Sequence, residues 1–95
     1  MSNQWIELMD RFRSRLEILE DKADDGKVSR VWRLCCLEQA LEVLEEDPDV
    51  ASKHLNDFDR SPAPAEMLAL SSKFPRPPDV KDIRARFDNL GGGIV

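Results

Sequence analysis

The sequence has no tyrosine, one histidine and only two cysteines, Cys35 and Cys36, which are adjacent. Neighbouring cysteines cannot form an ordinary disulfide with each other because the ring would be strained, so a disulfide-rich secreted scaffold is excluded. A four-ligand zinc site would need a second Cys or His pair. His54 has neither a nucleophile nor a metal partner to act with. We therefore expect no metal site, no cofactor and no enzymatic activity.

Long apolar runs are also missing. No run approaches the roughly 20 residues that cross a bilayer, and the N-terminus carries acids and arginines where a signal peptide needs a plain apolar stretch. The net charge is −5, and the basic residues form no uninterrupted stripe. A chain of this sign is repelled by phosphate backbones and anionic lipids. We expect a cytoplasmic protein that binds neither nucleic acid nor membrane.

What the chain does contain is helical periodicity. Its 95 residues are 41% hydrophobic and 35% charged, which is enough for one small core. The pattern predicts an all-α fold, a small bundle of four to five helices with a Pro-rich linker before the last one. We expect residues 1–74 to form the bundle domain, and residues 75–95 to form the linker, an amphipathic helix and a Gly-rich tail. The predicted helices span about 3–23, 28–46, 48–58, 62–72 and 80–90.

The first predicted helix carries a heptad seam, in which apolar residues recur at alternating steps of four and three. The seam consists of Trp5, Met9, Phe12, Leu16 and Leu19. It resembles a coiled-coil face, and two-fold dimers are the commonest oligomers, so we expect a homodimer. Ser2 or Asn3 is the expected N-cap, and Asp24 to Gly26 the expected end of this helix.

The second predicted helix has two apolar faces. One holds Val28, Val31, Trp32 and Cys35; the other holds Cys36, Leu37, Ala40, Leu41, Val43 and Leu44; Glu38, Glu42 and Glu45 form a polar stripe. Two faces need two neighbours, so this helix is either the centre of the domain or contacts a second protein with its N-terminal half.

The charges of the second predicted helix oppose its dipole, with Arg30 and Arg33 near its start and Glu45 to Asp47 at its end. Either solvation and capping account for this order, or the helix offers a binding surface of mixed charge.

Proline and aspartate mark the later helix boundaries. Asp47 before Pro48 predicts a cap and first turn, and Ser61 before two prolines predicts the same for the fourth helix. That short helix is expected to bury Met67, Leu68 and Leu70. Asp79 is the predicted cap of the fifth helix, with Asp82 in a capping-box position.

Cys35 and Cys36 point about 100° apart on a helix, so they cannot chelate one metal well, and we interpret both as small packing residues. The alternative is a thiol- or metal-dependent sensor. A reactive thiol would need cations to lower its pKa, and Arg30 and Arg33 are the nearby candidates.

The last predicted helix has a seam of Val80, Ile83, Phe87 and Leu90 after its proline spacer. A helix of about three turns is marginal alone in water, so the seam must dock somewhere. It can dock in cis, on the first two helices, or in trans, in a groove of a partner.

These observations favour a small acidic protein–protein interaction module, of the adaptor, chaperone or inhibitor kind. Aromatic side chains dominate binding energy where they are exposed. The predicted partner-binding residues are Trp5, Met9, Phe12, Trp32, Arg33, Ile83 and Phe87. The partner is another protein, and the alternative function is the sensor built on Cys35 and Cys36.

Overall fold

The computed structural model describes residues 3–21 and 27–92, and within them the chain forms helices and no strand. The elements are α1 (Asn3–Glu20), α2 (Lys27–Val43), α3 (Pro48–Phe58), α4 (Pro64–Ser71), α5 (Val80–Phe87) and a short π-helix, η1 (Asp88–Gly92). The predicted all-α bundle is confirmed. The predicted cap at Ser2 and the predicted helix end at Asp24 to Gly26 lie outside the described residues.

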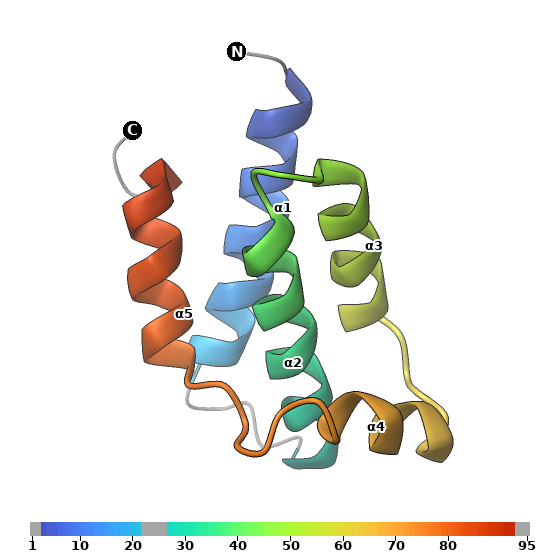
Figure 1. The fold of residues 1–95 in the computed structure, drawn as a ribbon. Helices are drawn as coiled ribbons and strands as arrows, with labels where there is room; N and C mark the ends of the chain where they lie inside the picture. The colour runs from blue at the N-terminus through green and yellow to red at the C-terminus, as the bar shows by residue number, and fades with distance from the viewer. Residues whose placement is uncertain (1–2, 22–26, 93–95) are drawn as a thin grey trace.

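The axes of α1, α2, α3 and α5 lie roughly parallel or antiparallel to one another, and α4 crosses one end of this bundle (Figure 1). α1 and α3 run one way, while α2 and α5 run the other. α4 lies across the end of the bundle where α2 begins and α3 finishes, and the chain then passes along that end to reach α5. One side of α4 therefore faces the bundle and the opposite side faces away from it.

Local capping chemistry sets several helix boundaries as predicted. The Asp47 carboxylate accepts a hydrogen bond from the Val50 amide at 3.3 Å, and Pro48 opens α3. The Asp79 carboxylate accepts from the Lys81 amide at 3.0 Å at the start of α5. Each bond satisfies an amide that the first helical turn leaves without a partner.

Three boundary predictions need correction. α2 ends at Val43, because residues 44–46 form a turn. α4 begins at Pro64 with Ala63 as its N-cap, so Ser61 is not the cap. Asp82, predicted to form a capping box with Asp79, instead pairs with Arg86: its carboxylate lies 2.9 Å from the guanidinium, as an i,i+4 ion pair on the surface of α5.

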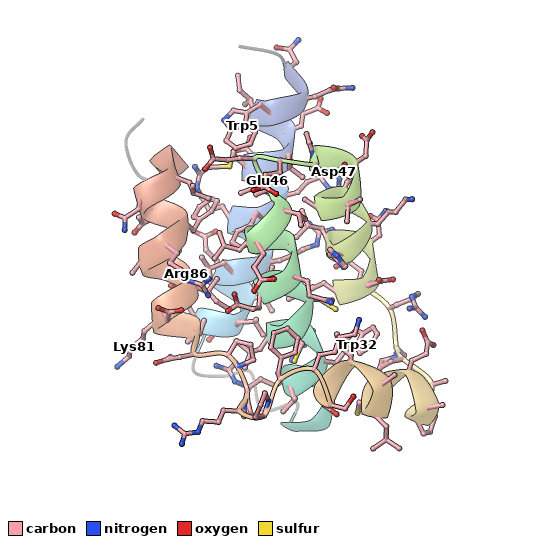
Figure 2. The ribbon with its side chains drawn as sticks, viewed as in Figure 1. Trp5, Trp32, Glu46, Asp47, Lys81 and Arg86 are labelled. Carbon is pink, nitrogen blue, oxygen red and sulfur yellow. The ribbon has the colours of Figure 1, made fainter. Side chains whose placement is uncertain are left out.

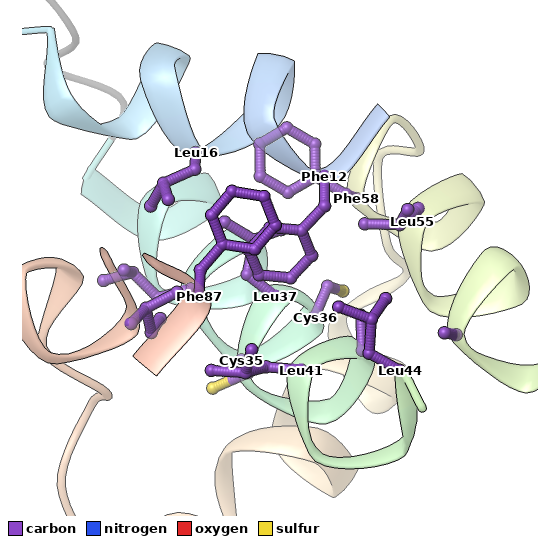
Figure 3. Packing of buried hydrophobic residues seen from close by; sticks show 14 of the residues in the cluster. Phe12, Leu16, Cys35, Cys36, Leu37, Leu41, Leu44, Leu55, Phe58 and Phe87 are labelled. Carbon is purple, nitrogen blue, oxygen red and sulfur yellow. The ribbon is translucent and has the colours of Figure 1, made fainter. Parts of the chain in front are cut away.

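The core is one cluster, and every α-helix of the described chain contributes to it (Figure 3). α2 is the central helix, which is one of the two interpretations that its two apolar faces left open, and it packs against α1, α3, α4 and α5. Its fully or almost fully buried hydrophobic side chains are Trp32, Leu34, Cys35, Cys36, Leu37, Ala40 and Leu41, and Leu44 in the turn that follows is also buried. The expected polar stripe is wrong at one position: Glu38 is only 8% exposed, and its carboxylate pairs with Arg86 of α5.

Arginines connect α1 to the helices around it. Arg11 donates to the Ser52 hydroxyl at 2.6 Å and to the Asn56 side-chain oxygen at 2.7 Å. Arg15 donates to the Leu55 carbonyl oxygen at 3.1 Å. Arg30, near the start of α2, donates to the Leu19 carbonyl oxygen at 2.8 Å. A cation there complements the C-terminal end of the α1 dipole, so Arg30 has a stabilising role within the chain itself.

α5 docks in cis. Ile83 and Phe87 are 0% exposed and belong to the same core as the first three helices. Arg84 ties α5 to the end of α1, donating to both carboxylate oxygens of Glu20 at 2.8 and 2.6 Å. This two-point bond lowers the pKa of Glu20. The proline spacer thus leads the chain back to its own bundle.

Candidate functional site

Most of the predicted partner-binding side chains are core residues in this structure. Met9, Phe12, Ile83 and Phe87 are between 0% and 6% exposed, and Phe12 stacks directly on Phe87. A partner could reach them only if α5 left the bundle. Their role in the folded chain is to hold α1, α2 and α5 together.

The two tryptophans lie at opposite ends of the bundle, so they cannot form one surface (Figure 2). Trp5 is half-buried and packs against the core near the end that carries Glu46 and Asp47. Trp32 is 5% exposed and lies at the end where α4 crosses. The structure places neither ring as an exposed anchor.

Hydrogen bonding and cations fix Trp32 in place. Its indole N–H donates to the Asp57 carbonyl oxygen at 2.8 Å, near the end of α3. The Arg60 guanidinium carbon lies 5.7 Å from the centre of the indole ring. Arg33, the one charged residue among the predicted partner contacts, is half-buried and lies 5.7 Å from the centre of the Phe58 ring. These cation–π contacts stabilise the junction of α2 and α3.

The α1 seam that suggested a homodimer is also inside the bundle. Met9, Phe12, Leu16 and Leu19 are all buried by the helices of the same chain. The coiled-coil face is therefore satisfied within one molecule. A homodimer remains a prediction, but this seam no longer supports it.

The cysteines are packing residues, as interpreted from the sequence. Both are 1% exposed, and Figure 3 shows them on different sides of α2. Burial raises the pKa of the Cys36 thiol to about 12, and burial together with the Glu38 charge raises the pKa of Cys35. Since the thiolate is the reactive and metal-binding form, these surroundings oppose the sensor alternative.

Among residues 3–21 and 27–92, no three His, Cys, Asp or Glu side chains come together in a way that could hold a metal ion. His54 is half-buried on α3, and burial lowers its pKa, so that the neutral imidazole is favoured. Asp57 and Glu42 oppose this shift, and Lys73 adds to it. A neutral, half-buried histidine of this kind is a boundary residue between α3 and its neighbours.

One shallow groove, of about 180 Å³, lies where α1 meets the start of α3. It is smaller than the 300–1,000 Å³ typical of small-molecule sites. Its only cation, Arg11, already bonds Ser52 and Asn56. The groove is lined by Gln4, Glu7, Leu8, Arg11, Pro48, Asp49 and Ser52. Nothing in this lining supplies a catalytic pair.

The feature that stands apart is α4, whose sequence PAEMLALS is apolar except for one glutamate and one serine. Its position is fixed at the N-terminal end. The Glu66 carboxylate accepts from the Ala63 amide at 3.2 Å and from the Arg60 guanidinium at 2.8 and 3.2 Å. These bonds lower the pKa of Glu66. Pro64 fits the first turn because its missing N–H would have no helical partner there.

The side chains of α4 do not lie where the sequence suggested. Of the three predicted to be buried, only Leu70 is, at 9% exposure; Met67 is half-buried, and Leu68 is 72% exposed. The prediction for Leu68 was wrong because eight residues crossing the end of a bundle can turn only one side inward. Pro64, Ala65 and Ala69 are exposed with Leu68. These four residues are named here the outer face of α4.

The outer face differs from the other exposed apolar positions of the described chain. Ile6 and Ile18 on α1 are 51% and 47% exposed, and charged residues neighbour each of them along that helix. Around Leu68, the positions three and four residues away are Pro64, Ala65, Ser71 and Ser72, none of which is charged. The outer face is thus an apolar patch rather than one isolated side chain. Sequence reasoning missed it because a helix that is apolar all round gives no sign of which side faces out.

No helix in the described part of the chain has the length and apolar content to cross a membrane. Comparison with known protein families, with curated proteins and with solved structures finds no match for this chain.

Proposed function

We propose that this chain acts by binding another protein, and that the outer face of α4 is the surface it uses. The observation that carries the proposal is the 72% exposure of Leu68 in a patch without charge, on a helix held in place from its other side. We expect the partner to be a cytoplasmic protein, because the sequence favours the cytoplasm for this chain. We propose no catalytic step.

Energetics support a binding role for this face. Burying a leucine side chain contributes about 1.5–3 kcal/mol relative to leaving it exposed. The fold does not use this contribution, because α4 is anchored to α2 by Leu70 and to the α3 end by the Arg60–Glu66 pair. A partner that covers Leu68 would gain it. An adaptor, a chaperone or an inhibitor could each use such a surface.

The proposal is tested by co-purification from the native host with three forms of the full chain: wild type, Leu68→Glu and Ile18→Glu. Ile18 is the matched control, since it is also an exposed apolar residue of a helix. Proteins retained by wild type and Ile18→Glu but lost with Leu68→Glu support binding through the outer face. If all three forms retain the same proteins, or if none retains any, the proposal fails.

A further inference from the structure

We propose that α5 exchanges between two copies of this chain at high concentration, forming a dimer in which each α5 completes the bundle of the other copy. This inference goes beyond the proposed function and does not depend on the outer face of α4. It draws on the chain segment that precedes α5 and on the contacts that α5 makes.

Residues 75–78, with the sequence PRPP, form the hinge that such an exchange requires. The hinge lies between two residues that pack against the core, Phe74 and Val80. Within the described chain, no backbone hydrogen bond involves the hinge, and its three prolines have no N–H to donate. The hinge can therefore change its conformation without breaking a backbone hydrogen bond of the bundle.

The sequence of the hinge favours an extended chain. Proline fixes φ at about −65°, and a residue that precedes proline avoids the helical region. Phe74, Arg76 and Pro77 each precede a proline, so every residue from 74 to 78 is restricted in one of these two ways. The single chain nevertheless bends at residues 75 and 76 on its way to α5 (Figure 1). Straightening this bend carries α5 away from its own bundle.

The contacts of α5 can be made equally well on a second copy. Phe87 stacks on Phe12 of α1. Arg84 donates to the Glu20 carboxylate at 2.8 and 2.6 Å, also on α1. Both partners precede the hinge in the chain, so an exchanged α5 finds the same two residues on the other bundle. The dimer needs no new interface, which makes exchange a low-cost route to association.

The surface beneath α5 selects another α5 over an unrelated helix. Glu38 of α2 is 8% exposed and pairs with Arg86, so whatever covers Glu38 must supply a cation. The same occupant has to fill the fully buried position of Ile83 and present a ring to Phe12. A second copy of this chain carries that pattern of side chains.

Concentration decides between the two arrangements. A short linker holds α5 at an effective concentration of the order of 1 mM near its own bundle, and a hinge that favours extension lowers this value. Exchange therefore competes with closure within one chain as the protein approaches about 1 mM. Ile83 and Phe87 are fully buried, so α5 must leave the core before it exchanges, and monomer and dimer interconvert slowly.

The first test refolds the full chain from urea at about 1 μM and at about 1 mM, and compares the products by chromatography with light scattering. We expect the 10.9 kDa monomer at low concentration and an added species of twice that mass at high concentration. The dimer should persist for hours after dilution. Replacing all three hinge prolines with glycine should lower the dimer yield about threefold or more, because a flexible linker bends back readily. Pro62→Gly, outside the hinge, is the control and should leave the yield unchanged.

A pair of charge-reversed chains identifies the exchange itself. Glu20→Arg and Arg84→Glu each place like charges together in the monomer, and both side chains are partly exposed, so circular dichroism should show each variant folded. In an exchanged dimer with one copy of each variant, both α5 helices meet an opposite charge at this position. Refolding the mixture should yield about fivefold more dimer than either variant alone at the same total concentration.

A chain that stays monomeric at the higher concentration would overturn the proposal. So would a dimer whose yield does not rise on mixing the charge-reversed variants, because contact between intact bundles leaves each α5 in its own chain. Leu68→Glu should leave the dimer unchanged, and loss of the dimer in that variant would assign the association to the outer face of α4 instead. These results are separate from the co-purification that tests the proposed function, so either proposal can fail alone.

Discussion

Phe12 of α1 and Phe87 of α5 stack with their ring centroids 4.7 Å apart and their planes 17° apart. Both rings are fully buried, and 75 positions separate them in the chain. The first and last helices are therefore joined at the centre of the bundle. Loss of α5 would therefore remove buried side chains from the core and expose Phe12, instead of shortening the bundle at its surface.

Replacing Phe87 with alanine should destabilise the whole described bundle. Removing a buried phenylalanine costs about 3–5 kcal/mol, a large fraction of the roughly 5–15 kcal/mol by which domains are stable. The free energy of unfolding is measured by urea denaturation, followed by tryptophan fluorescence. Ile18→Ala, at a position 47% exposed, is the control and should cost less than about 1 kcal/mol. A Phe87→Ala chain as stable as the control would mean that α5 is not part of the cooperative unit.

The ion pair between Glu38 and Arg86 should contribute measurably, because the glutamate is 8% exposed as a residue. Glu38→Gln keeps the shape and removes the charge, and we expect it to cost about 1–2 kcal/mol. The arginine is partly exposed and also pairs with Asp82, which limits the effect.

A double-mutant cycle with Arg86→Met isolates the pair, and a coupling free energy near 1 kcal/mol is expected. Asp82→Asn serves as the surface comparison, with a change below about 0.5 kcal/mol. Zero coupling between positions 38 and 86 would show that the pair adds nothing to stability.

The two thiols should react slowly in the native protein. At pH 8, a Cys36 pKa of about 12 leaves roughly one thiol in ten thousand ionised, and burial limits access as well. We expect a disulfide reagent to label Cys35 and Cys36 only as fast as the chain opens, and at once in denaturant. Rapid labelling of either thiol without denaturant would revive the sensor alternative.

Stability should decrease on mild acidification because of His54. Burial lowers its folded-state pKa below the usual 6.5, so the unfolded chain takes up the proton first as the pH falls. The contribution of the neutral form is complete above pH 6.5 and is lost as the pH drops towards the folded-state pKa. Urea denaturation between about pH 7.5 and 5 should show this slope in wild type, and His54→Gln should lack it.

Glu20 provides an internal comparison. Arg84 lowers its pKa from the usual 4.5, so its contribution is lost at lower pH than that of His54. The stability loss below about pH 4.5 should therefore persist in His54→Gln. An unchanged slope between pH 7.5 and 5 in that variant would assign the acid sensitivity to another group.

Sequence alone determined the features that depend on neighbours along the chain. The helices, the caps at Asp47 and Asp79 and the packing role of Cys35 and Cys36 follow from periodicity and capping, which act within a few residues. The two apolar faces of α2 also indicated that this helix meets two neighbours, but they left open whether one of these belongs to a second protein, and the structure shows all of its neighbours within the chain.

Only the tertiary structure decided which apolar faces cover each other. The seams of α1 and α5 could serve a partner or the bundle, and the Phe12–Phe87 stack shows that they meet within one chain. Glu38 belongs to a polar stripe in the sequence, yet α5 covers it. Leu68 and Leu70 are both leucines of the same short apolar helix, and nothing in the sequence distinguishes them. Leu68 is exposed and Leu70 is buried because α4 crosses the end of the bundle and turns only one side inward. Burial is a property of contacts between distant segments, so periodicity within one helix cannot specify it.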